Sequence, residues 1–204
     1  MFGSEIIIVV ISLLIAVTIH EWAHAYTAYL LGDPTAKNEG RLTLNPLAHL
    51  DLMGTIALIF VHFGWGKPVP VNPNNLKNPK KDTLLISLAG PISNLTVALF
   101  FALPFKFFLQ DINGFFPILV ESIIFLNLVL AVFNLLPIYP LDGSEIVIAF
   151  TPARYGLILN KFIDYGPLFL FGIIIIEHTT DLPILWNFLS PIVNFLWLAI
   201  NLTT

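Results

Sequence analysis

The amino-acid sequence predicts an all-α polytopic membrane protein with about five to six transmembrane helices. Of its 204 residues, 57% are hydrophobic and only 11% are charged, which is typical of a membrane protein and not of a soluble domain. Several apolar stretches reach the ~20 residues that a helix needs to cross a bilayer, and residues 182–202 contain no charged side chain. Polar segments rich in Pro, Asn and Lys separate these stretches, as expected for loops.

The first apolar stretch, residues 6–31, predicts a helix that stays attached to the chain and spans the membrane, because it is far longer than a signal-peptide core. Gly32, Asp33 and Pro34 follow it directly, and this combination ends helices. The remaining long helices are predicted, in order, over residues 83–109, residues 115–150 with a break at Pro137 and Pro140, a stretch that ends at Ile176, and residues 182–202.

Residues 52–66 form a shorter apolar stretch that predicts a re-entrant or β-like segment after the first helix. Its 15 residues would make a helix of about 22 Å, less than the ~30 Å hydrocarbon core. The positive charges agree, because Lys and Arg collect in cytoplasmic loops. If the loops around residues 35–51, 67–82 and 151–164 are all cytoplasmic, the first helix runs from outside to inside and residues 52–66 enter and leave on one side.

Composition also limits the ligands and partners of the protein. The sequence contains no cysteine, so a bound metal must be held by His, Asp or Glu. The net charge is -4 and no long basic run is present, which excludes nucleic acid as an expected partner.

The sequence HEWAH, residues 20–24, lies within the first apolar stretch and has the spacing of a metal-binding motif. His20 and His24 are four residues apart, so their imidazoles lie one turn apart on one helix face and can bind a single ion. Glu21 lies about 100° around the helix, near enough to take a proton from a water that the ion polarises. Ionisable side chains at membrane depth cost ~2.5–3.5 kcal/mol each, which favours function over the alternative of buried polar residues that bridge helices.

A catalytic zinc needs a third protein ligand and an open fourth position. Asp142 is the best candidate, because the prolines before it open the helix and allow a carboxylate to turn inward. His20 lies about 16 Å from the inner end of its helix and Asp142 about 12 Å from the inner end of its own. These depths agree only if both segments run from outside to inside, which requires that residues 52–66 do not cross. Weaker candidates, better interpreted as interfacial or capping residues, are His49, His62, Glu121, Glu177 and His178.

The sequence resembles the site-2 protease family of intramembrane zinc metalloproteases. The resemblance rests on HEWAH and NLLPIYPLDG, and further on RLTLNPLAHLD, GWGKPVPVNP and LAGPISN, the last being similar to a GxxxN helix motif of the family. It covers roughly residues 11–145. It implies one zinc ion held by His20, His24 and Asp142, with Glu21 as catalytic base. It also implies that Asn134 and Asn94 bind the substrate backbone or the oxyanion, whereas interhelical hydrogen bonding is the alternative for each.

The motifs and the resemblance together predict a single integral-membrane metalloprotease domain over residues 1–204. Its catalytic core is expected at about 5–150 and its C-terminal helices at about 155–204, and no PDZ or CBS domain is expected. Its expected partners are the lipid bilayer and a transmembrane substrate, cut in regulated intramembrane proteolysis, while the sequence does not specify an oligomeric state. We expect it in the cell membrane of a prokaryote, with the site nearer the cytoplasmic face. A metal or proton transporter and a non-catalytic membrane scaffold remain as alternative functions.

A transmembrane substrate hides its peptide carbonyls in helical hydrogen bonds, so it must unwind before cleavage. The alternating apolar residues from Lys67 to Asn72 suit extended backbone at a sheet edge. The sequence therefore favours β-augmentation, in which residues 69–72 pair with the unwound substrate.

Overall fold

The structure is a computed structural model that describes residues 2–61, 64–109, 111–180 and 182–201. The described residues are mainly helical, and the only β-pairing among them is one isolated antiparallel bridge between Leu50 and Gly66. The helices are, in order, α1 (Phe2–Leu30), α2 (Thr35–Asn38), α3 (Leu52–Val61), α4 (Pro79–Pro104), α5 (Phe115–Asn134), α6 (Gly143–Phe150), α7 (Gly156–Thr180) and α8 (Ile184–Asn201). The predicted all-α class is confirmed.

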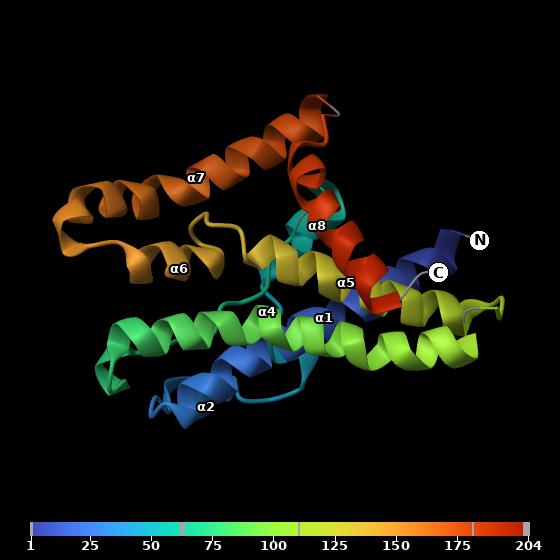
Figure 1. Ribbon diagram of the computed structural model, residues 1–204, viewed down its shortest axis with the longest axis horizontal. Coiled ribbons are helices and arrows are strands. Elements are labelled where there is room, and N and C mark those ends of the chain that lie inside the picture. Colours follow the sequence, from blue (N-terminus) through green and yellow to red (C-terminus); the bar gives the residue numbers. More distant parts are fainter. Residues whose placement is uncertain (1, 62–63, 110, 181, 202–204) are drawn as a thin grey trace.

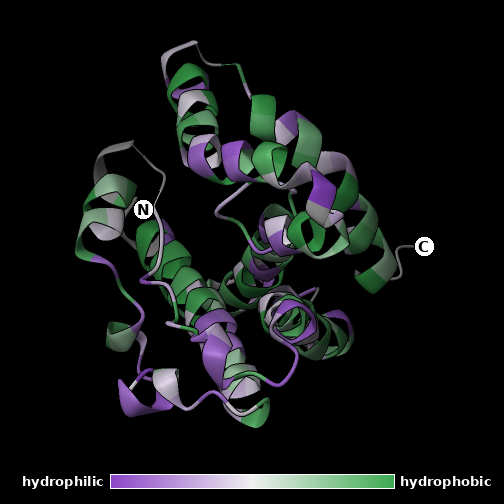
Figure 2. Ribbon diagram, turned by 90° about the vertical axis from the view of Figure 1, so that its left-hand side faces the viewer, coloured by the Kyte–Doolittle hydropathy of each residue, from purple (hydrophilic) through white to green (hydrophobic). Residues whose placement is uncertain are grey.

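Four of these helices are long and apolar enough to cross a membrane, namely α1, α4, α5 and α7. A π-helical turn, Phe105–Leu109, prolongs α4, and α8 is a further apolar helix that is shorter than the other four. Figure 2 shows hydrophobic residues along the long helices and hydrophilic residues gathered in the segments that join them. The protein is therefore a polytopic membrane protein, as its sequence predicts.

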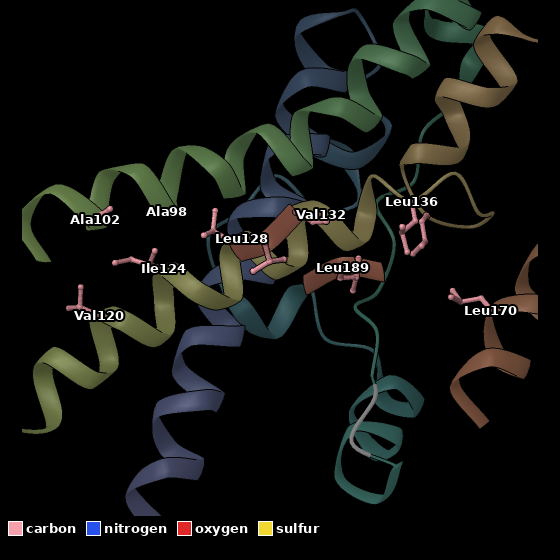
Figure 3. Close-up of a cluster of buried hydrophobic side chains, with 11 residues drawn as sticks. Ala98, Ala102, Val120, Ile124, Leu128, Val132, Leu136, Leu170 and Leu189 are labelled. Carbon is pink, nitrogen blue, oxygen red and sulfur yellow. The ribbon is translucent and has the colours of Figure 1, made fainter. Parts of the chain in front are cut away.

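Helices α1, α4 and α5 form the central bundle and make most of the contact between elements (Figure 1). Its main hydrophobic cluster lies between α4 and α5, where Ile124 and Leu128 are completely buried. The two C-terminal helices also contribute to this cluster, α7 with Leu170 and α8 with Leu189 (Figure 3). Because lipid tails are as apolar as these side chains, the cluster stabilises the bundle through close van der Waals packing between helices.

The predicted break in residues 115–150 is confirmed. Helix α5 ends at Asn134, α6 begins at Gly143, and the residues between them form turns. Pro137 and Pro140 have no backbone N–H and cannot continue a helical ladder, which explains the break. Asp142 consequently stands immediately before the first turn of α6.

Residues 52–66 fold back on themselves, which is the geometry expected of a re-entrant segment. Helix α3 has 10 residues and is about 15 Å long. After it, the chain returns so closely that a β-carbon on Gly54 would lie 3.0 Å from the backbone nitrogen of Trp65. The bridge between Leu50 and Gly66 then joins the two ends of the segment. The chain therefore leaves this segment where it entered.

Candidate metal centre

The bundle brings together two histidines of α1 and the carboxylate that precedes α6. The Nε2 atoms of His20 and His24 lie 3.0 Å apart, and Asp142 Oδ2 lies 3.1 Å from the first and 3.4 Å from the second. The exposed fractions of the two histidines are only 5% and 8%. Among the described residues, this is the one group of three or more His, Asp or Glu side chains that could hold a metal ion.

Hydrogen bonds on the far side of each imidazole fix which nitrogen carries the proton. Nδ1 of His20 lies 2.7 Å from Asn94 Oδ1, and Nδ1 of His24 lies 2.7 Å from the carbonyl oxygen of Ile86. Because carbonyl oxygens only accept hydrogen bonds, both Nδ1 atoms are donors, and both Nε2 atoms keep a free lone pair. This is the arrangement found in metal-ligating histidines, whose other ring nitrogen donates to a fixed acceptor.

The three ligating atoms fit a divalent cation. Asp142 Oδ2 is buried and has no hydrogen-bond partner, although it faces two imidazole lone pairs. Three electron-rich atoms in contact repel one another unless a positive charge lies between them. Ligands at 2.0–2.2 Å from a tetrahedral zinc are separated by about 3.3–3.6 Å, and these atoms lie 3.0–3.4 Å apart, so a small outward movement would admit the ion. Two imidazoles and one carboxylate also leave a fourth position open, as catalytic zinc requires.

Glu21 follows His20 on α1 but does not belong to the ligating group. Its side chain is half-buried and faces the residues that return from α3. A β-carbon on Gly66 would lie 3.7 Å from Glu21 Oε1 and 3.2 Å from a methyl carbon of Val17. The predicted base therefore follows one metal-group residue along α1 and lies beside Gly66, where the chain returns from α3.

Asn94 is fully buried and uses its amide within the protein. Its oxygen accepts from His20, and its nitrogen donates to the carbonyl oxygen of Ala16 (3.0 Å) and to Asn127 Oδ1 (2.8 Å). These bonds match the alternative of interhelical hydrogen bonding, and the expected role of Asn94 in substrate binding stays a prediction. Sequence reasoning missed Asn127, although a fully buried amide in the apolar α5 is itself a signal of function.

Asn134 is the last residue of α5 and is half-buried. Its amide nitrogen donates to the carbonyl oxygen of Leu130 within the same helix (3.1 Å). Its expected role in substrate binding also stays a prediction.

Gly90 is a second residue that sequence reasoning missed as part of the site. It faces the ligands from α4, where an added β-carbon would lie 2.5 Å from Cε1 of His20 and 2.6 Å from Cε1 of His24. No real β-carbon tolerates such distances. Gly90 stands four residues after Ile86 and four before Asn94, so one face of α4 contacts both imidazoles and accepts a hydrogen bond from each. The GxxxN spacing in the sequence was the available signal.

The weaker ligand candidates all lie outside the group. The Nε2 atom of His49 lies 2.8 Å from the carbonyl oxygen of Thr43, and Glu177 accepts from the backbone of Leu185. Of the others, Glu121 is exposed, His178 lines an apolar cavity beside α7, and His62 lies outside the described residues.

Replacing Asn94 by Leu is expected to weaken zinc binding about 10–100-fold, because His20 loses the acceptor that orients its ring. Zinc affinity, measured by competition with a chelating dye, checks this. Thr96→Val is the matched control, since Thr96 lies on the exposed face of the same helix. Unchanged zinc affinity together with a raised KM would instead support substrate binding by Asn94.

Comparison with known proteins gives consistent matches to zinc metalloproteases. The model of "Peptidase family M50" matches residues 111–176, which include Asp142. Two relatives bear the name "Putative zinc metalloprotease": YwhC of Bacillus subtilis and Rip2 of Mycobacterium tuberculosis. YwhC is 41% identical over 194 residues, which cover 89% of this chain and 85% of YwhC. Rip2 is 30% identical over 148 residues, which cover 70% of this chain and 56% of Rip2.

A third relative is "Zinc metalloprotease MJ0392" of Methanocaldococcus jannaschii, which is 30% identical over 146 residues. That match covers 72% of this chain and 35% of MJ0392. No solved structure matches the chain.

Proposed function

Because the chain belongs to peptidase family M50, the site-2 protease family of zinc metalloproteases, we propose that it hydrolyses a peptide bond within or near a transmembrane segment of a membrane-protein substrate. The observation that carries this proposal is that two of the three residues of the metal group lie inside an apolar helix long enough to cross a bilayer. His20 is ten residues from the end of α1 at Leu30, or about 15 Å along the helix axis. The chemistry thus takes place at membrane depth.

His20, His24 and Asp142 are the proposed zinc ligands, and Glu21 is the proposed base. Zinc, when bound, supplies a Lewis acid that polarises the attacking water and the substrate carbonyl. Glu21 takes a proton from this water and then delivers it to the departing amine. Ligation by two His and one Asp also suits iron or cobalt, and zinc is favoured by the names of the relatives.

Positive charge supports an orientation in the membrane. Most Lys and Arg residues lie in the segments that follow α1, α3 and α6 or in the first two turns of α4 and α7, and Lys and Arg favour the cytoplasmic side. With these loops in the cytoplasm, the metal group lies nearer the cytoplasmic face of a prokaryotic cell membrane. We propose this location together with the function.

The substrate has to unwind to expose a carbonyl, and residues 67–72 offer it a place to bind. This segment, which we name the edge segment, follows Gly66 directly and so begins beside Glu21. It is not helical, and its last residue, Asn72, has extended backbone angles of φ -106° and ψ 104°. An extended substrate that pairs with it would be held next to the metal group.

Purified protein in lipid vesicles with a single-span model substrate tests the function. We expect cleavage that is lost when a chelator removes the metal and is restored by zinc, with about one zinc ion per chain by elemental analysis. Vesicles that contain the substrate alone are the control. Cleavage by metal-free protein would contradict the proposal, and zinc movement across the vesicle membrane without cleavage would identify a transporter.

A further inference from the structure

From residue 68 to residue 71, the edge segment presents backbone N–H donors on one side only. Pro68 and Pro70 have no backbone N–H, and they alternate with Val69 and Val71, which do. Peptide groups two residues apart in extended backbone face the same side. Within the described part of the chain, the backbone groups of Val69 and Val71 make no hydrogen bond. They form a short open edge, with donors and acceptors for one incoming strand.

A buried arginine holds the first end of the edge segment. The exposed fraction of Arg41 is only 4%. Its guanidinium donates to the carbonyl oxygens of Lys67 and Pro68, the second at 2.9 Å. No ion pair joins Arg41 to a carboxylate of the described residues, so these carbonyl groups are what compensates the buried charge. Burying an arginine is costly without such partners, and Arg41 therefore has a fixed place.

A buried aspartate holds the other end. Asp33 lies in the turn after α1 and is fully buried, and its Oδ2 accepts from the backbone N–H of Asn72 at 2.7 Å. Its Oδ1 accepts from Asn75 Nδ2 at 2.7 Å and from Thr35. Burial by itself raises the pKa of Asp33, but the hydrogen bonds from Asn75, Thr35 and Asn72 outweigh burial and lower it below its usual value. Asp33 is therefore ionised at neutral pH and is a strong acceptor.

We propose that Arg41 and Asp33 are positioning residues that hold the edge segment extended from both ends, so that Val69 and Val71 can pair with an unwound substrate. The hydrogen-bond partners of Arg41 and Asp33 do not include any residue of the metal group. The inference rests on the proposed function. It adds which residues hold the edge segment in place for the substrate. A segment that is already ordered loses little conformational entropy on binding, so loosening either end weakens substrate binding more than catalysis.

Arg41→Met and Asp33→Asn are expected to raise KM about tenfold or more, with zinc content and kcat close to wild type. Asp82→Asn is the matched control, because Asp82 is also buried but accepts from the backbone of Asn78 at the start of α4. It should leave KM unchanged. Val71→Pro removes one N–H from the edge directly and should raise KM as the two positioning variants do.

Binding is also measurable without cleavage, because the chain contains no cysteine. In a Glu21→Gln background, Val71→Cys gives one thiol, and its disulfide crosslinking to a single-cysteine substrate reports pairing at the edge. We expect the crosslinked yield to fall several-fold when Arg41→Met or Asp33→Asn is added. Arg41→Lys, which keeps the charge but not the planar fork, should give an intermediate yield and serves if Arg41→Met fails to fold.

Wild-type KM and wild-type crosslinking in the folded variants of Arg41 and Asp33 would overturn the inference. Equal losses of kcat, zinc content and thermal stability, shared by Asp82→Asn, would also overturn it, because they indicate a general structural role. Failure of the proposed function looks different, since the wild-type protein would then not cleave at all. The crosslinking experiment still reports on the edge segment in that case.

Discussion

Replacing Glu21 with Gln is expected to lower the rate of peptide cleavage by about 10²–10⁴-fold while the protein still binds zinc. Gln has almost the same shape but cannot take a proton from the attacking water. Zinc should remain because the three ligating atoms come from His20, His24 and Asp142 and not from Glu21. The rate is measured with the single-span substrate in vesicles, and the zinc content by elemental analysis of the same preparation.

Glu5→Gln is the matched control for this prediction. Glu5 lies on the same helix and is exposed near the N-terminal end of that helix. The Glu5→Gln variant should therefore cleave the substrate at the wild-type rate. Full activity of Glu21→Gln would remove Glu21 as the base. Loss of zinc from Glu21→Gln would instead mean that Glu21 supports the ligands, and the assignment of its role would be wrong.

Replacing Gly90 with Ala is expected to weaken zinc binding about 100-fold and to lower activity in proportion when zinc is limiting. The added methyl group would overlap both imidazoles, whose Cε1 atoms lie 2.5 Å and 2.6 Å from its position. Overpacking costs about 1–3 kcal/mol, and displacing His24 also breaks its hydrogen bond to the carbonyl oxygen of Ile86, at a further cost of about 0.5–1.5 kcal/mol. Zinc affinity is the direct measurement.

Helix propensity acts in the opposite direction, which makes this result diagnostic. Ala is favoured over Gly in a helix by about 0.5–1 kcal/mol, so Gly90→Ala would stabilise α4 if packing were indifferent. Gly172→Ala in α7 is the matched control, because no atom lies within 4 Å of a β-carbon at that position. It should leave zinc affinity unchanged. Wild-type zinc affinity in Gly90→Ala would show that the histidines do not stand where the structure has them.

Much of the fold follows from local properties of the sequence. The ends of α1 and α5 are set by Gly32, Pro137 and Pro140, whose effect on the backbone does not depend on distant contacts. The short length of residues 52–66 and the positive loops on both sides of them were enough to predict a segment that does not cross. Its folding back against Gly54 is a tertiary contact, and the sequence indicated only that the chain must return.

Part of the candidate metal group also follows from local properties of the sequence. His20, Glu21 and His24 lie within one turn or so of a single helix, so their spacing alone fixes their relative positions. Asp142 was predicted from depth and from the proline break, and it does lie beside the two histidines. Periodicity and chain direction determine such features, and both can be read from a sequence.

Only the tertiary structure decided what surrounds these ligands. The bonds from Asn94 to His20 and Asn127, the approach of Gly90 and the hold of Arg41 and Asp33 on the edge segment all join residues far apart in the chain. They depend on the register at which α1, α4 and α5 pack, and a shift of one residue rotates a helix face by about 100°. The sequence by itself indicated the candidate ligands and the chemistry they favour, because both follow from residue type and helical spacing, whereas side-chain packing between helices determined how these residues are oriented.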